Sequence, residues 1–205
     1  MDNKIIIGAR GSKLSLAYAS KVRELILNKS KATEKMIEIK IIKTSGDLFK
    51  SENISDLGGK NLFCKEIENE LTAKKIDIAI HALKDMGAEE SDKLVVQAFI
   101  ERNDPRDALV SFKFKNLSEI NSGRVGSSSK RRELQLGLIN KKNKIKSIRG
   151  NVDTRIQKVK EGHYEGVILA LAGLKMLKME KLVKEVFSLN DFIPAIGQGI
   201  IAAQC

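Results

Sequence analysis

The sequence predicts an α/β protein of two domains, each built on a mixed, mostly parallel sheet flanked by helices. Short β-branched runs alternate with amphipathic helical patterns, which is typical of parallel strands with helices packed on their faces. The alternation occurs in two series, separated by turn-forming residues at Asn103-Asp104-Pro105. The chain has 205 residues, which is long enough for two small domains with their own cores.

The first series covers residues 1–99, which we assign to the first domain. Apolar β-branched runs predict strands at residues 4–10, 36–44 and 76–83. Helical spacing predicts helices at residues 14–27 and 62–73. The second series covers residues 100–199, the second domain. Its predicted strands lie at residues 124–128, 144–149 and 166–172, and its predicted helices lie at residues 130–139, 154–161 and 172–186.

Four groups of polar residues directly follow predicted strands. They are Arg10-Gly11-Ser12, Lys84-Asp85, Ser127–Ser129 and Arg149-Gly150-Asn151. In open α/β folds, ligands bind at the carboxyl ends of strands, beside helix N-termini. A random scatter of charge would not sort in this way, so these positions indicate ligand sites.

The segment SSSKRR at residues 127–132 is interpreted as an anion site. One serine before a helix is an ordinary N-cap. Three serines with free backbone N–H groups and the helix dipole favour a bound anion, which Ser128 and Ser129 would contact. Arg131 and Arg132 fall in the first turn, where cations are unfavourable, so a compensating anion is expected. A solvated basic face is the alternative.

The segment IRGNVDTR at residues 148–155 repeats this pattern. Gly150 allows the backbone to turn, and Asn151 can cap a helix. Arg149 and Arg155 could then converge on one pocket. The planar guanidinium group matches a carboxylate or a phosphate.

The segment HALKDMG at residues 81–87 contains the candidate for chemistry. In a cleft lined with arginines, Asp85 would stay ionised and could stabilise a developing cation or move a proton, whereas an ordinary surface pair with Lys84 is the alternative. His81 lies within an apolar strand and is interpreted as a core histidine. Lys60, in the glycine-rich segment DLGGKNLF, could reach a bound anion. That segment lacks the Walker pattern, which argues against a nucleotide.

Composition narrows the class of partner. The net charge of +11 favours an acidic partner, although a lysine-rich solvated surface explains it equally well. Aromatic residues make up only 4% of the chain, which argues against stacking on nucleic acid. Cys64 and Cys205 have neither metal-ligand nor disulfide spacing, so no metal site is expected and a reducing compartment is indicated. Neither a signal peptide nor a membrane span is expected, which predicts a cytoplasmic protein.

Nine motifs in order resemble the porphobilinogen deaminase family, also called hydroxymethylbilane synthases. They are GARGSKLSLA, KTSGD, GGKNLFCKEIE, DIAIHALKD, ERNDPRDALVS, VGSSSKRR, IRGNVDTR, GVILALAGLK and IPAIGQG. The resemblance implies two domains like type II periplasmic binding proteins, with residues 200–205 returning to the first and an active cleft between them. It also implies a transferase of haem biosynthesis that joins four porphobilinogen units into hydroxymethylbilane with loss of ammonia.

The resemblance assigns roles to individual residues. Asp85 would be the catalytic carboxylate, and Lys60 would belong to a lid loop. Carboxylates of the substrate and of the dipyrromethane primer would be held by Arg10, Ser12, Lys84, Ser128, Ser129, Arg131, Arg132, Arg149, Asn151 and Arg155. Gln198 would lie in the interdomain hinge region. Small-molecule porphobilinogen is the expected partner of a monomer, with neither nucleic acid nor a membrane involved.

The sequence also departs from the family pattern. Ala82, Met86-Gly87, Asp153 and Met176 stand where the family usually has serine, valine-proline, glycine and arginine. A third domain that carries the dipyrromethane-binding cysteine is expected to be missing, so no cofactor-attachment cysteine is expected in this chain. A non-catalytic module that binds polycarboxylates therefore remains the alternative function, and duplex binding is a weaker one.

Overall fold

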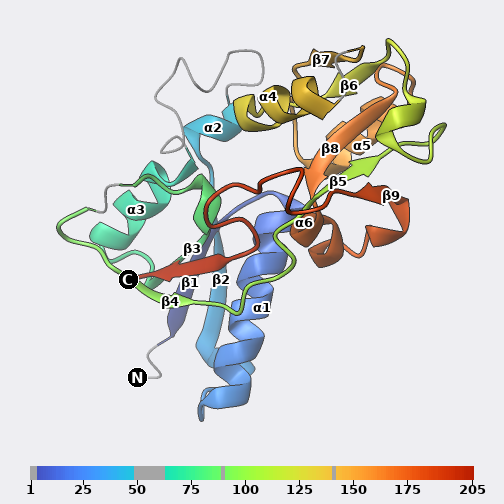
Figure 1. Ribbon diagram of the computed structural model, residues 1–205. Coiled ribbons are helices and arrows are strands. Elements are labelled where there is room, and N and C mark those ends of the chain that lie inside the picture. Colours follow the sequence, from blue (N-terminus) through green and yellow to red (C-terminus); the bar gives the residue numbers. More distant parts are fainter. Residues whose placement is uncertain (1–3, 49–62, 89–90, 140–141) are drawn as a thin grey trace. The chain divides into compact units, whose positions relative to one another are not determined.

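The computed structural model describes residues 4–48, 63–88, 91–139 and 142–205. The chain separates into two units. Unit 1 comprises Met1–Arg102 and Ile200–Cys205, and unit 2 comprises Asn103–Gly199. The chain therefore passes from one unit to the other twice, once into unit 2 and once back (Figure 1).

Unit 1 is built on a five-stranded mixed sheet, sheet A, with the strand order β2-β1-β3-β10-β4. Its strands are β1 (Ile5–Arg10), β2 (Ile37–Ile42), β3 (Ile78–Ala82), β4 (Val96–Phe99) and β10 (Ile201–Gln204). Strand β1 is parallel to β2 and β3. Strand β10, which returns from unit 2, is antiparallel to β3 and β4.

Unit 2 repeats this topology in sheet B, with the strand order β7-β6-β8-β5-β9. Its strands are β5 (Asp107–Val110), β6 (Arg124–Gly126), β7 (Lys144–Lys146), β8 (Gly166–Ala170) and β9 (Val183–Val186). Strand β6 is parallel to β7 and β8, and β5 is antiparallel to β8 and β9. Strand β5, which enters from unit 1, thus holds the place that β10 holds in sheet A. The predicted α/β class with two mixed sheets is confirmed.

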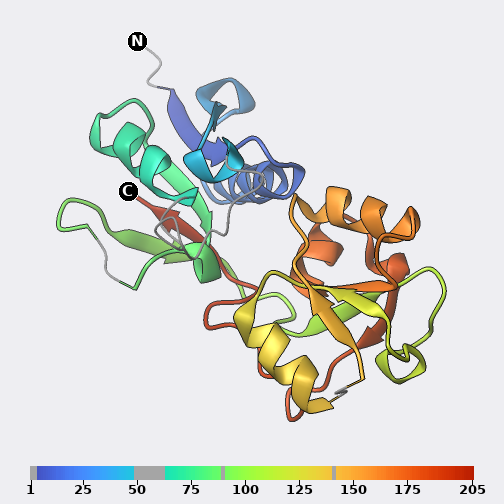
Figure 2. The ribbon, with the colours of Figure 1, turned by 90° about the horizontal axis from the view of Figure 1, so that it is seen from above.

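Helices pack on both faces of each sheet. The α-helices are α1 (Lys13–Lys29), α2 (Ser45–Leu48), α3 (Lys65–Thr72), α4 (Lys130–Ile139), α5 (Val152–Lys160) and α6 (Leu171–Met176). The 3-10 turns are η1 (Glu34–Met36), η3 (Leu83–Asp85), η4 (Leu117–Glu119) and η5 (Glu180–Leu182). Within unit 1, α1 and α3 lie on opposite sides of β1; within unit 2, α4 and α5 lie on opposite sides of sheet B (Figure 2).

The core of unit 2 shows why its central strands are apolar throughout. Successive residues of a strand point to opposite faces of a sheet. Ala108 and Val110 pack with α5 residues Ile156 and Val159, whereas Leu109 packs on the other face in a cluster with Leu136 of α4. Both faces of β5 are therefore buried, which removes the polar alternation of a half-exposed strand.

The helix predicted over residues 172–186 is wrong after Met176. Helix α6 ends at Met176, and residues 183–186 form β9 instead. Strand β9 pairs with β5, and Ala108 lies opposite Val186. Pairing with a distant strand overrides local helix propensity here. No described helix has both the length and the apolar character that crossing a bilayer requires.

Candidate functional site

All four polar groups lie at the carboxyl ends of strands, as the sequence predicts. Arg10 ends β1, Lys84 and Asp85 lie in η3 after β3, the three serines follow β6, and Arg149-Gly150-Asn151 follows β7. Two sets result. The first set, on unit 1, includes Arg10, Ser12 and Asp85. The second set, on unit 2, consists of Ser128, Ser129, Arg131, Arg132, Arg149, Asn151 and Arg155. Lys60 lies outside the described residues.

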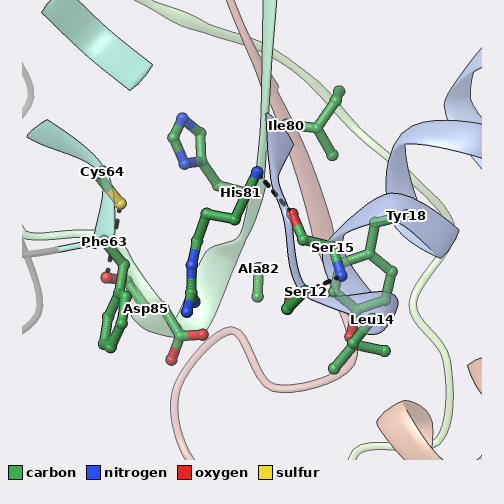
Figure 3. A pocket seen from close by; sticks show the side chains of 11 residues that line it. Ser12, Leu14, Ser15, Tyr18, Phe63, Cys64, Ile80, His81, Ala82 and Asp85 are labelled. Atoms are coloured by element: carbon green, nitrogen blue, oxygen red, sulfur yellow. Dashed lines mark hydrogen bonds between the residues drawn. The ribbon is translucent and has the colours of Figure 1, made fainter. Parts of the chain in front are cut away.

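The first set lines a small cavity of about 60 Å³ (Figure 3). Its walls come from the end of β1, the first turns of α1, Phe63 and Cys64 before α3, and the end of β3 with η3. The side chain of Asp85 lies near the ring of Phe63, while Ser12, Leu14 and Tyr18 stand on the α1 side of the cavity (Figure 3). Among the described residues that line this cavity, Arg10 and Asp85 carry the formal charges, one positive and one negative.

Local hydrogen bonds hold the first set in place. Ser12 is the N-cap of α1, and its Oγ accepts a hydrogen bond from the Ser15 backbone N–H at 3.2 Å. The Arg10 backbone N–H donates to Ser15 Oγ at 3.1 Å. The Arg10 guanidinium lies 4.0 Å from the centre of the Phe63 ring, a cation–π contact that orients it. A 3-10 turn, closed by Met86 N–H donating to Leu83 O at 3.2 Å, positions Asp85.

The other titratable side chains of this cavity stay neutral at pH 7. Burial lowers the pKa of His81 to about 4, against the smaller opposing effects of Gln204 and Asp85. Burial, reinforced by the charge of Asp85, raises the pKa of Tyr18 to about 12. His81 is buried, as predicted for a core histidine, but within the described residues its Nε2 has no hydrogen-bond partner. Because His81 and Tyr18 are neutral, the charged side chains among the described lining residues are Asp85 and Arg10.

The side chains of Ser127, Ser128 and Ser129 all form hydrogen bonds with backbone groups. Ser127 Oγ accepts a hydrogen bond from Ser129 N–H at 3.2 Å. Ser128 Oγ donates to Ile148 O at 2.5 Å and accepts from Ile148 N–H at 3.2 Å, which ties the end of β6 to the segment after β7. Ser129 Oγ accepts from Arg132 N–H at 3.4 Å in the manner of an N-cap. The capping interpretation therefore describes Ser129, and Ser128 acts as a cross-strand clamp.

Arg131 and Arg132 share an anion that belongs to the protein. Asp107, at the start of β5, is fully buried. Its Oδ2 accepts from Arg131 Nη2 at 2.7 Å, and its Oδ1 accepts from Arg132 Nε at 3.1 Å and Nη2 at 2.7 Å. Burial alone would raise the pKa of Asp107, but the charges and hydrogen bonds of Arg132 and Arg131 outweigh it and hold that pKa below its usual range. The anion that the first turn of α4 requires is thus internal.

The two arginines differ in what remains for a ligand. Arg132 is buried, and its Nη1 donates to Ile168 O at 2.9 Å, so this side chain is a core ion pair. Arg131 keeps 25% of its side chain exposed. Its Nη1 donates to Ile193 O, and its guanidinium lies 5.7 Å from the centre of the Phe192 ring. Of the pair, Arg131 is therefore the one that can meet a bound carboxylate.

Asp107 is the functional candidate that sequence reasoning missed. A signal was present, because Asp107 opens the apolar run Asp107–Val110, every residue of which is buried. A buried acid needs a partner, and the arginines of SSSKRR were cations for which the sequence already called for an anion. Gln198 joins the same group, since its Nε2 donates to Asp107 Oδ1 at 3.0 Å and to Pro105 O at 2.6 Å. Gln198 precedes the point at Gly199 where the chain leaves unit 2.

The second turn, at residues 149–155, is built around a glycine. Gly150 has a φ of +107°, a conformation that favours glycine. Arg155 Nε donates to Gly150 O at 2.7 Å. Asn151 occupies the N-cap position of α5, but its side chain makes no capping hydrogen bond. Asp153 lies in the first turn of α5, where a negative charge suits the helix dipole.

Both cysteines are free thiols. Cys64 is buried, and its Sγ donates to Asp85 O at 3.7 Å. Burial, with the charges of Glu68 and Asp85, raises the pKa of Cys64 to about 12. Burial also raises the pKa of Cys205, although its residue is exposed overall. The thiolate is the nucleophilic form of a cysteine, and a raised pKa lowers its population at neutral pH.

Comparison with solved structures identifies the fold. The chain is similar to the methionine-binding protein MetQ, with a TM-score of 0.57 at 13% identity over 99% of this chain and 83% of that one. It is also similar to a periplasmic substrate-binding protein of an ABC transporter from Coxiella burnetii, with a TM-score of 0.55 at 12% identity over 97% of this chain and 83% of that one. These likenesses concern the fold alone, which is the predicted fold of type II periplasmic binding proteins.

Comparison with sequences identifies the family. The porphobilinogen deaminase of Campylobacter hominis is 40% identical over 206 residues, which cover 99% of this chain and 66% of the relative. That of Exiguobacterium sibiricum is 42% identical over 204 residues, covering 98% and 66%. The chloroplastic enzyme of Oryza sativa subsp. japonica is 40% identical over 204 residues, covering 98% and 57%. The chain thus spans less than two thirds of the length of these relatives.

A family profile matches nearly the whole chain. Residues 5–205 match the family described as porphobilinogen deaminase, dipyromethane cofactor binding domain. The match includes both sheets and both sets of strand-end residues. The chain therefore belongs to the porphobilinogen deaminase family.

Proposed function

We propose that this chain provides the substrate-binding and catalytic units of a porphobilinogen deaminase, a transferase that joins four porphobilinogen units into hydroxymethylbilane. The observation that carries the proposal is the cavity of unit 1, where Asp85 and Arg10 stand among neutral and apolar side chains. Porphobilinogen offers carboxylates that an arginine can bind, and its aminomethyl carbon becomes electrophilic as ammonia leaves.

The reaction needs a fixed negative charge. The aminomethyl C–N bond breaks, ammonia leaves, and the remaining carbon becomes an electrophilic azafulvene cation. The free α-carbon of the next pyrrole attacks that carbon, a C–C bond forms, and the attacking carbon loses its proton. Asp85 would stabilise the cation and accept hydrogen bonds from the pyrrole N–H. Because Tyr18 and His81 are neutral at pH 7, Asp85 is the acidic group that can do this among the described lining residues.

The donor sets fit the carboxylates of the substrate and of dipyrromethane. Each pyrrole carries an acetate and a propionate, and the exposed guanidinium of Arg131, with Arg149 and Arg155, offers the planar donors that carboxylates prefer. Lys84, Ser12 and Asn151 are further contacts in the proposal. When bound, dipyrromethane supplies the pyrrole α-carbon that starts the chain. Arg132 is assigned no contact with the ligand, because only 8% of its side chain is exposed, against 25% for Arg131.

The test is turnover by the purified chain. Porphobilinogen consumption is followed with Ehrlich's reagent, ammonia is measured, and the product is oxidised to uroporphyrin. Asp85→Asn is compared with Asp92→Asn, an exposed carboxylate of the same unit. Loss of turnover in the first variant only is the expected result. Binding of porphobilinogen without turnover in the wild type would instead favour a non-catalytic polycarboxylate-binding module.

We also propose a cytoplasmic monomer whose two thiols carry no primer. The buried and free state of Cys64, and the free state of Cys205, are compatible with a reducing compartment. Light scattering during gel filtration measures the mass of the particle. Intact-protein mass spectrometry measures covalent primer, and a mass increment equal to dipyrromethane would contradict the assignment of both cysteines.

A further inference from the structure

The unusual feature of unit 2 is that one buried carboxylate organises three donor side chains. Asp107 accepts four hydrogen bonds, from Arg131, from Arg132 twice and from Gln198, at distances of 2.7–3.1 Å. The carboxylate is fully buried, so these donors replace all of its water. Removing water from a charge is costly unless partners satisfy it, and here both oxygens are satisfied.

The charges of this group do not cancel. Two guanidinium groups and one carboxylate leave one net positive charge. Arg132 has 8% of its side chain exposed and Arg131 has 25%, so the unbalanced charge faces solvent through Arg131. Arg131 is fixed at three points: Asp107 Oδ2, Ile193 O and the Phe192 ring. A guanidinium held in this way loses little conformational entropy when it binds a carboxylate.

We propose that Asp107 is a positioning residue, which fixes Arg131 at the start of α4 so that one net positive charge is presented there to a carboxylate of the pyrrole substrate. The inference rests on the proposed function for the identity of that ligand. Asp107 itself does not touch the ligand. It acts through Arg131, while Arg132 and Gln198 hold the carboxylate in position.

The substitution that tests this is Asp107→Asn, which keeps the shape and removes the charge. If the amide oxygen replaces Oδ1 beside Arg132, the amide NH₂ faces Arg131 Nη2, donor against donor, and Arg131 moves. We expect porphobilinogen binding, measured by calorimetry, to weaken by about tenfold or more. Asp104→Asn is the matched control, because Asp104 also pairs with an arginine, Arg106, at 2.7 Å, but not with α4.

A double-mutant cycle separates positioning from general damage. Arg131→Gln is made alone and together with Asp107→Asn. If Asp107 acts through Arg131, its substitution weakens binding in the wild type and has little further effect when Arg131 is already replaced. Equal losses in both backgrounds, or wild-type affinity in a folded Asp107→Asn variant, would overturn the proposal.

Two further measurements decide the remaining cases. If Asp107→Asn does not fold, NMR of the wild-type arginine side chains is used. Slow rotation of the Arg131 guanidinium before ligand is added supports the proposal, and order that appears only with ligand refutes it. If the wild type does not bind porphobilinogen, the proposed function fails, and succinate becomes the probe. Succinate binding that requires both Asp107 and Arg131 then supports positioning, whereas no succinate binding overturns it.

Discussion

The two units have the same strand topology. They differ in where a site carboxylate stands, which is Asp85 in unit 1 and Asp107 in unit 2. In sheet A, Ile201 of β10 lies opposite Ala82, the last residue of β3. In sheet B, Asp107 of β5 lies opposite Ala170, the last residue of β8. Three residues after these alanines stand Asp85 in unit 1 and Gly173 in unit 2. At these two equivalent positions, unit 1 therefore has isoleucine and aspartate, whereas unit 2 has aspartate and glycine.

This difference has a chemical consequence. In unit 1, the equivalent residue Ile201 is apolar and buried, and the carboxylate of Asp85 lines the cavity, where it can act on a cation. In unit 2, Asp107 is buried and forms ion pairs with Arg131 and Arg132 of α4. The same scaffold therefore places a carboxylate beside Arg10 in the cavity wall of unit 1, and a buried carboxylate paired with two arginines in unit 2. The fold alone would not distinguish these roles.

Removing the anion of unit 1 should have the largest effect. Asp85→Asn is expected to lower turnover by about 10²–10³-fold, since a fixed charge at a developing cation contributes on the order of 3–4 kcal/mol. Stability should change little, because Asp85 is half-buried and forms no ion pair with a described residue that would be broken. Urea unfolding beside the turnover assay checks both. If Asp85→Asn and Asp92→Asn have equal activity, the Asp85 carboxylate has no catalytic role, and the proposed functional difference between the units is wrong.

Removing a cation of unit 2 should act on stability first. Arg132→Met leaves Asp107 buried with fewer partners, and we expect the free energy of unfolding to fall by about 3 kcal/mol. Lys130→Met is the control on the same helix turn, with 87% of its side chain exposed. The free energy of unfolding of this control should stay within about 0.5 kcal/mol of the wild-type value. If both variants unfold at the same urea concentration, Arg132 is not the core ion pair that the structure shows.

Acid should affect the two units in different pH ranges. Burial lowers the pKa of His81 to about 4, so folding favours its neutral form. The contribution of His81 to the free energy of unfolding is complete above the unfolded-state pKa of about 6.5. It falls as the pH drops toward 4, by at most about 3 kcal/mol. Asp107 also has a lowered pKa, and its contribution is lost only as the pH falls below about 4, the value for an unfolded aspartate.

Two histidine variants check the acid prediction. His81→Gln should flatten the dependence of stability between pH 6.5 and 4, a range set by the unfolded-state value of about 6.5 and the folded value of about 4. His163→Gln is the control, because His163 is exposed on unit 2. Urea titrations at a series of pH values, with hydrogen exchange to separate the units, give the readout. A loss of stability that starts in unit 2 above pH 5 would contradict the assignment of this pH dependence to His81 of unit 1.

The helix caps should give the smallest and most similar effects. Ser12→Ala and Ser129→Ala each remove an N-cap hydrogen bond, of 3.2 Å in α1 and 3.4 Å in α4. Each should cost about 1 kcal/mol of stability, and the shorter bond should cost the more. Thermal unfolding measures the difference. A much larger loss for Ser129→Ala would mean that this serine also holds Arg132 in place.

Part of the site was predictable from local pattern. Residues that end strands and begin helices have recognisable sequence signals, so the positions of Arg10, Asp85, Ser129 and Arg149 followed from the alternation of strand and helix. The need for an anion beside Arg131 also followed, because cations oppose the dipole of the first turn. Strand β9 did not follow, since its partner β5 lies more than 70 residues away in the sequence.

The sequence by itself determined the α/β class, the location of the polar groups at strand ends and the family. Those properties depend on periodicity and on short motifs, which are local. Only the tertiary structure decided which anion compensates the arginines, because Asp107 is 24 residues from Arg131 and reaches it through sheet B. It also decided that Ser128 clamps two strands and that His81 is neutral, since burial and pairing arise only when distant segments pack together.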